Sequence, residues 1–134
     1  MPSNGETNLD NLLASMKPML HEGEYVFCSI AKGKYGDYTE ASPIAAFIEQ
    51  EGMTLVLERQ SAELYNLQYD SIFKAITLTV HSSLEAVGLT AVVASKLAEN
   101  GISANVIAGY YHDHIFVQSE KAELAMDVLN EFSS

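Results

Sequence analysis

The chain has 134 residues, of which 48% are hydrophobic and 19% are charged, and its formal net charge is −11. This length supports one ordinary hydrophobic core or two small ones and excludes a third domain. The hydrophobic content is typical of a globular protein. Because so acidic a surface repels phosphate backbones and anionic lipid, we expect neither nucleic acid nor a membrane as a partner.

The cysteine content and the hydropathy of the chain indicate its compartment. Cys28 is the only cysteine, and it lies in an apolar, strand-like run where a thiol usually serves as a small buried hydrophobe. The N-terminus lacks the basic start and apolar stretch of a secretory signal, and no run reaches the roughly 18 apolar residues of a membrane-spanning helix. We therefore expect a cytoplasmic protein.

The first half of the chain predicts short elements separated by turns. In chain order they are a helix from the N-cap Asn8 to about Pro18, a strand at 24–30, a loop at 32–42, a hairpin of two apolar runs at 43–50 and 53–58, and one or two helical turns at 61–65. Gly52 lies between the two runs of the hairpin, so we expect it to adopt a positive φ.

The second half has clearer hydrophobic periodicity, which changes from two residues, typical of a strand, to 3.6 residues, typical of a helix, and back. It predicts a strand at 74–80, a helix with the stripe Leu89, Val92, Val93 and Leu97, a strand at 102–109, a polar tip of His112, Asp113 and His114, a strand at 115–117, and a helix at 124–132. The order β-α-β-β-α lacks only the last strand of a ferredoxin-like unit. Since an open apolar sheet edge promotes aggregation, we expect a strand from the first half to complete it.

The segment 81–117 concentrates the local signals for a binding site. Ser82 and Glu85 have the spacing of a capping box, and Gly88 precedes the apolar stripe of the helix. A glycine at a strand-to-helix junction permits close backbone approach, and the first amides of the helix favour a carboxylate. An α-amino acid would fit there, with its carboxylate at the amides of Gly88 and Leu89 and its ammonium near Asn105.

Several sequence motifs of the chain resemble those of the ACT domain family. The phrases GEYVFCSI, HSSLEAVGLTA, LAENGISANVIA and YYHDHIFV are similar to a group of small bacterial proteins predicted to bind amino acids, which are related to the ACT modules of CASTOR-type arginine sensors. The chain departs from many ACT domains in lacking their Asp-x-Pro-Gly phrase before the helix; only the glycine is kept.

The resemblance implies an α+β, ferredoxin-like fold of two ACT-like βαββα units in tandem, which share or exchange strands in antiparallel sheets with helices on one face. We expect a degenerate N-terminal half at 1–70 and a C-terminal ACT domain at 71–134. The resemblance also implies a ligand pocket, and we expect no cofactor. Its residues would be Ser82, Ser83, Leu84, Val87, Gly88, Leu89, Thr90, Asn105, Val106 and Ile107.

Simpler explanations exist for the same residues. Gly88 is also typical of a packing or turn glycine, and Asn105 of an exposed strand position. His81, His112, Asp113 and His114 are potential metal ligands, but a His-x-His pair is a weak signal. Consecutive strand residues point to opposite faces, so His81 and Ser82 are poorly placed for proton transfer.

The sequence therefore predicts a non-catalytic regulatory protein that binds an amino acid or a related metabolite. We expect it to form a homodimer whose sheets join edge to edge. The alternative is a ligand-free ACT-like module for dimerisation or protein interaction. A weaker third possibility is a metal-dependent enzyme that uses the region of His112 and His114.

Overall fold

The computed structural model describes residues 8–79 and 88–133. The chain forms two compact units, one made of Met1–Glu22 with Lys74–Ser134 and the other of Gly23–Phe73. We call them the composite unit and the central unit. The predicted boundary near residue 70 stays a prediction, while the compact units group the first 22 residues with the C-terminal segment. No helix within the described ranges is long and apolar enough to cross a membrane.

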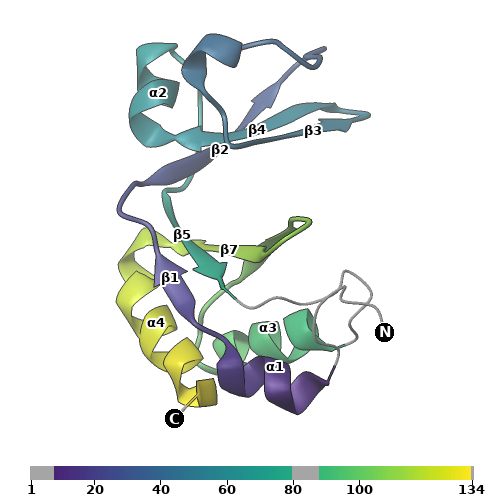
Figure 1. Cartoon of the computed structure of the whole chain (residues 1–134). Helices are drawn as coiled ribbons and strands as arrows, with labels where there is room; N and C mark the ends of the chain where they lie inside the picture. Colours follow the sequence, from purple (N-terminus) through teal and green to yellow (C-terminus); the bar gives the residue numbers. More distant parts are fainter. Residues whose placement is uncertain (1–7, 80–87, 134) are drawn as a thin grey trace. The chain divides into compact units, whose positions relative to one another are not determined.

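The composite unit contains an antiparallel arrangement of strands with α-helices against one face (Figure 1). Its elements are α1 (Leu9–Ser15), β1 (Pro18–Leu20), β5 (Phe73–Leu78), α3 (Leu89–Glu99), β6 (Asn105–Ala108), β7 (Asp113–Gln118) and α4 (Ala122–Asn130), with 3-10 helices η2 (Ser119–Lys121) and η3 (Glu131–Ser133). β5 is flanked by β1 and β7, and β6 follows β7. This is the strand arrangement of a ferredoxin-like unit in which β1 takes the place of the last strand.

β1 confirms that a strand from the first half completes the C-terminal sheet. It pairs antiparallel with β5, with Pro18 opposite Leu78 and Leu20 opposite Ile76. The His21 amide donates to the Ala75 carbonyl at 2.9 Å and extends the pairing by one residue. A strand of three residues was too short to detect by periodicity, because alternation needs about four residues to be recognised.

The core of the composite unit lies between the helices and the strands. It contains buried side chains from α1, β5, α3, β7 and α4, together with Met16 just after α1 and Ile102 between α3 and β6. Its members are Leu12, Met16, Ile76, Leu78, Leu89, Val93, Leu97, Ile102, Ile115, Val117, Ala122, Ala125, Val128 and Leu129. Three of the four residues of the predicted stripe on α3 are buried, namely Leu89, Val93 and Leu97, and the fourth, Val92, is half-buried. The predicted N-cap of α1 is also correct, because the Asn8 side chain accepts a hydrogen bond from the Asn11 amide at 3.0 Å.

The central unit contains three antiparallel strands and one short α-helix. Its elements are β2 (Tyr25–Ile30), the 3-10 helix η1 (Thr39–Ala41), β3 (Ala45–Glu49), β4 (Gly52–Glu58) and α2 (Arg59–Leu64). β4 lies between β2 and β3. The core of this unit consists of Val26, Cys28, Ala41, Met53, Leu55, Leu57 and Ala62. Cys28 is thus a buried thiol, and Gly52 has the expected positive φ, at +154°.

The hairpin of β6 and β7 differs from the predicted one. Asp113 and His114 belong to β7, opposite Ala108 and Ile107, so they are not part of the tip. The turn is closed earlier, by a 2.9 Å hydrogen bond from the Gly109 amide to the His112 carbonyl. Polar side chains such as those of Asp113 and His114 are typical of a turn, but the backbone of both residues pairs with β6.

Candidate ligand-binding site

The structure describes only part of the site predicted from the sequence. Ser82, Ser83, Leu84 and Val87 lie outside the described residues, so the site stays a prediction. Gly88 is the N-cap of α3, and its φ of +99° lies in the left-handed region that favours glycine. A Cβ added at this position would lie 3.3 Å from Leu9 Cδ2. Backbone conformation and helix packing therefore already account for a glycine here.

The predicted strand residues lie on β6, at the edge of the described sheet. The Asn105 side-chain nitrogen donates a 3.1 Å hydrogen bond to the Phe116 carbonyl on the neighbouring strand. Asn105 is exposed and Thr90 is exposed, whereas Ile107 is half-buried and Leu89 is buried. The side-chain amide of Asn105 therefore has a structural partner, and its carbonyl oxygen is the atom that could accept from a ligand.

A pocket lies in the central unit, in a segment that the sequence indicated only as a loop. Its volume is about 390 Å³, which lies within the roughly 300–1,000 Å³ of typical small-molecule sites. The connection between β2 and β3 forms most of its wall, and β4 contributes two side chains. The lining residues are Tyr35, Gly36, Asp37, Thr39, Ser42, Pro43, Ile44, Ala45, Ala46, Met53 and Leu55.

The connecting loop has a defined backbone shape. Gly36, Tyr38 and Ser42 all have φ between +54° and +94°, in the left-handed region. The Lys34 amide donates to Asp37 Oδ2 at 3.0 Å, the Thr39 hydroxyl donates to the Gly36 carbonyl at 2.6 Å, and the Ser42 amide donates to the Thr39 carbonyl at 3.0 Å. Non-glycine residues in this region persist only where the surroundings hold them, so the loop is shaped by its own hydrogen bonds.

The pocket combines a polar rim with an apolar floor. Met53 and Leu55 are only 1% exposed and come from the core of the central unit. Asp37 is the only charged residue among those that line the pocket, and Thr39 and Ser42 add hydroxyl groups. A small molecule with one cationic group and one apolar group matches this lining. Turn signals at Gly36 and Asp37 identified the loop, but the pocket depends on β4, which is distant in sequence.

Three polar side chains of the composite unit form a hydrogen-bonded chain. The Thr77 hydroxyl oxygen lies 2.7 Å from His21 Nε2 and 3.0 Å from His114 Nδ1. A hydroxyl has one proton, so it donates to one of these imidazoles and accepts from the other, which links their tautomers. Burial lowers the pKa of His114, and the nearby His112 and His21 lower it further. The geometry is that of structural hydrogen bonding between strands.

The metal site considered from the sequence finds no support in this region. Within residues 8–79 and 88–133, no group of three or more His, Cys, Asp or Glu side chains is placed to hold a metal ion. His81 lies outside the described residues. Burial raises the pKa of Asp113, the carboxyl of the weak metal-ligand pattern that also includes His112 and His114.

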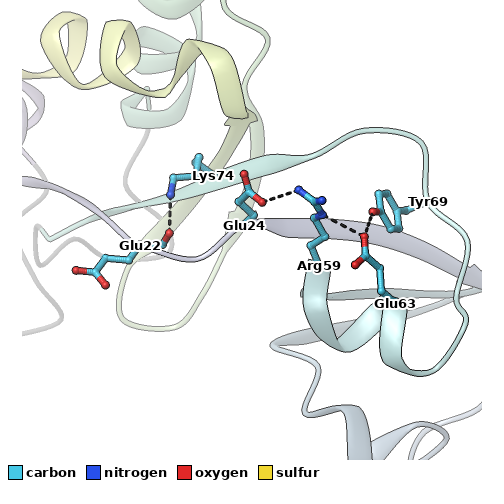
Figure 2. Close-up of polar contacts among 6 residues, drawn as sticks. All are labelled: Glu22, Glu24, Arg59, Glu63, Tyr69 and Lys74. Carbon is cyan, nitrogen blue, oxygen red and sulfur yellow. Dashed lines mark hydrogen bonds and ion pairs between the residues drawn. The ribbon is translucent and has the colours of Figure 1, made fainter.

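Figure 2 shows a polar network in the central unit around Arg59. Arg59 Nη1 lies 2.9 Å from Glu24 Oε1, and Arg59 Nε lies 3.2 Å from Glu63 Oε2. The Tyr69 hydroxyl donates to the same Glu63 oxygen at 2.6 Å. Hydrogen bonds from Tyr69 and Arg59 lower the pKa of Glu63. These solvent-screened groups connect α2 to its neighbouring segments. Because the Arg59 guanidinium is already paired with Glu24 and Glu63, the network suits a structural role.

Family comparisons identify the class of protein to which this fold belongs. A family model of the ACT domain matches residues 4–74, and a second ACT-domain model matches residues 71–131. The first match alone spans more than half of the chain, and this protein belongs to the ACT domain family. A search of curated proteins returns no match.

Solved structures share the fold over most of the chain. A protein of unknown function from Vibrio cholerae, described as a possible transport protein, is 59% identical with a TM-score of 0.87, and the match covers 94% of this chain and 96% of that one. A protein from Agrobacterium tumefaciens is 16% identical with a TM-score of 0.73, covering 88% and 89%. The ligand-free regulatory subunit of aspartate kinase from Thermus thermophilus is 9% identical with a TM-score of 0.61, covering 91% and 99%.

These comparisons confirm the fold class expected from the sequence, which is α+β and ferredoxin-like with ACT units in tandem. The structures with low identity show the shared fold alone. ACT domains are regulatory modules, so the class is that of a regulatory protein.

Proposed function

We propose that this protein is a non-catalytic regulatory protein that binds an amino acid or a related metabolite. The pocket of the central unit carries the proposal, because it has the volume of a small-molecule site, a hydrogen-bonding rim and an apolar floor. Binding would favour the loop conformation that fits the ligand, and this shift in population would be the regulatory signal. The buried, unpaired thiol of Cys28 is consistent with action in the cytoplasm.

The relatives support this proposal at the level of the fold. The similar chain from Thermus thermophilus is a regulatory subunit of aspartate kinase. The relation to the ACT modules of CASTOR-type arginine sensors is part of the proposal and makes arginine one of the compounds to test. The predicted site around Gly88 and Asn105 remains a second candidate position for a ligand in the composite unit.

A homodimer is the second part of the proposal. β3 is an edge strand of the central unit, because within the described residues it pairs only with β4. Phe47 and Ile48 on this strand are 70% and 52% exposed. An exposed apolar edge strand is suited to pairing with another chain, and a second copy offers an identical edge. The same surface is what the alternative function, a ligand-free interaction module, would use.

Native mass spectrometry followed by a thermal-shift screen tests both parts. The purified chain should have the mass of a dimer, and any retained small molecule should appear as an added mass. At 100 times the dissociation constant, a ligand stabilises the protein by about 2.7 kcal/mol, which gives a measurable rise in Tm. No shift with any of the twenty amino acids or with common small metabolites would reject the sensor and favour the interaction module.

A further inference from the structure

We propose that the pocket of the central unit selects α-amino acids whose side chains are uncharged and apolar. In this arrangement the ligand ammonium pairs with the Asp37 carboxylate, and the ligand side chain lies against the apolar wall formed by Pro43, Ile44, Ala45 and Ala46. This inference rests on the proposed function and names the ligand class of the same pocket.

Charge is the first step of the argument. Asp37 is the only charged residue among the eleven that line the pocket. Its Oδ2 accepts a hydrogen bond from the Lys34 amide, which orients the carboxylate and leaves Oδ1 to accept from a ligand. Lys32 and Lys34 flank the loop but are exposed and do not line the pocket. A second carboxylate on the ligand would therefore meet a negative group without a compensating cation.

The apolar wall of the pocket provides the second step. Met53 and Leu55 are 1% exposed and only underlie the pocket, so the apolar surface open to a ligand is that of Ile44, which is 53% exposed, and of the half-buried Pro43, Ala45 and Ala46. Covering this wall with an aliphatic side chain removes apolar area from water, which is favourable. A charged side chain against the same wall would lose hydration without gaining a partner, because Asp37, the one charged residue of the lining, is taken by the ligand ammonium. The wall thus disfavours cationic and anionic side chains alike.

The rim provides a place for the ligand carboxylate. The Ser42 hydroxyl has no hydrogen-bond partner among residues 8–79 and 88–133, whereas the Thr39 hydroxyl donates to the Gly36 carbonyl. Ser42 is therefore a free hydroxyl donor on the rim, and the hydroxyl of Tyr35, which is 80% exposed, is a second. A zwitterionic ligand would have its ammonium at Asp37 and its carboxylate towards Ser42, which leaves its side chain for the apolar wall.

Calorimetry on the full-length protein tests the inference. L-leucine, L-isoleucine, L-valine and L-methionine should bind, whereas L-aspartate, L-glutamate, L-lysine and L-arginine should bind at least about tenfold more weakly, which corresponds to about 1.4 kcal/mol. The 2-oxo acid that corresponds to leucine lacks the ammonium and should bind as weakly as the charged amino acids. Tighter binding of a charged amino acid would overturn the inference and leave the proposed sensor intact, whereas no binding of any amino acid would overturn both.

A substitution isolates the role of the carboxylate. Asp37→Asn keeps an oxygen that can accept from the Lys34 amide, but it removes the charge, so leucine affinity should fall about tenfold. Glu40→Gln is the matched control, because Glu40 is an exposed acid of the same loop that does not line the pocket. Equal leucine affinity in the two variants would refute the ammonium contact. If Asp37→Asn does not fold, the comparison of leucine with its 2-oxo acid on the unmodified protein decides the point.

Discussion

His114 shows how the surroundings of one side chain determine its charge. Its ring lies between the Thr77 hydroxyl on one side and Gly109 on the other, where an added Cβ would lie 3.3 Å from His114 Nε2. Burial, together with two neighbouring histidines, lowers its pKa in the folded protein. The neutral imidazole is therefore the form that fits this position.

This shift predicts that the protein loses stability on mild acidification. An unfolded histidine binds a proton near pH 6.5, whereas folded His114 binds one only at lower pH, so the unfolded state takes up more protons as the pH falls. The free energy of unfolding should decrease from pH 7.5 to pH 5.5. His114→Asn should flatten this dependence. Denaturant unfolding at several pH values measures the effect, and identical slopes in the unmodified protein and His114→Asn would contradict it.

The two ends of α3 show what glycine does at the scale of an element. Gly88 begins the helix with φ of +99°, and Gly101 follows it with φ of +76°. Both positions require the left-handed region, which is unfavourable for residues with a Cβ. They differ in their surroundings, because a Cβ at Gly88 would approach Leu9 Cδ2, whereas a Cβ at Gly101 would have no neighbour within 4 Å.

Replacing each of these glycines by alanine should destabilise the protein by about 1–2 kcal/mol. Gly101→Ala reports backbone strain alone, so any further loss in Gly88→Ala measures the contact with α1. Chemical denaturation of the two variants provides both values. A neutral Gly101→Ala variant would show that the end of α3 does not need the left-handed conformation. A stability loss in Gly88→Ala also means that this residue is a poor choice for testing a ligand site.

At the scale of the whole molecule, the N-terminal segment up to Glu22 forms one compact unit with the segment from Lys74 onwards. Leu12 and Met16 of α1 are fully buried in the core of the composite unit, and β1 pairs with β5. The C-terminal ACT unit thus contains a helix and a strand that come from the start of the chain. This exchange supplies the strand that the order β-α-β-β-α lacks.

Leu12→Ala should therefore destabilise the C-terminal part of the protein, although the residue lies near the N-terminus. The loss should be about 2–5 kcal/mol, as for other buried leucines. Hydrogen exchange should show faster exchange of the amides in β7 and α4. Leu64→Ala is the matched control, because Leu64 is 75% exposed on α2, and we expect a change within about 0.5 kcal/mol. Unchanged hydrogen exchange in β7 after Leu12→Ala would show that α1 does not stabilise the C-terminal core.

Particular residues show how far sequence reasoning extended. The periodicity of Leu89, Val93 and Leu97 predicted α3 correctly, and the cap at Asn8 predicted the start of α1, because both signals are local. The pocket was not predicted. Asp37 and Ser42 are close together in sequence, but Met53 and Leu55 reach the pocket only through strand pairing in the central unit. No local sequence pattern predicts that these four residues line the same pocket.

The amino-acid sequence by itself determined the acidic character, the order of the elements, the ferredoxin-like class and the need for one more strand. These properties follow from composition and from periodicities that act over a few residues. Only the tertiary structure decided which strand fills the edge, where the β6–β7 hairpin turns, and which loop forms a pocket on an apolar floor. These outcomes depend on pairing and packing between distant segments, whose energies arise only when those segments meet in the folded chain.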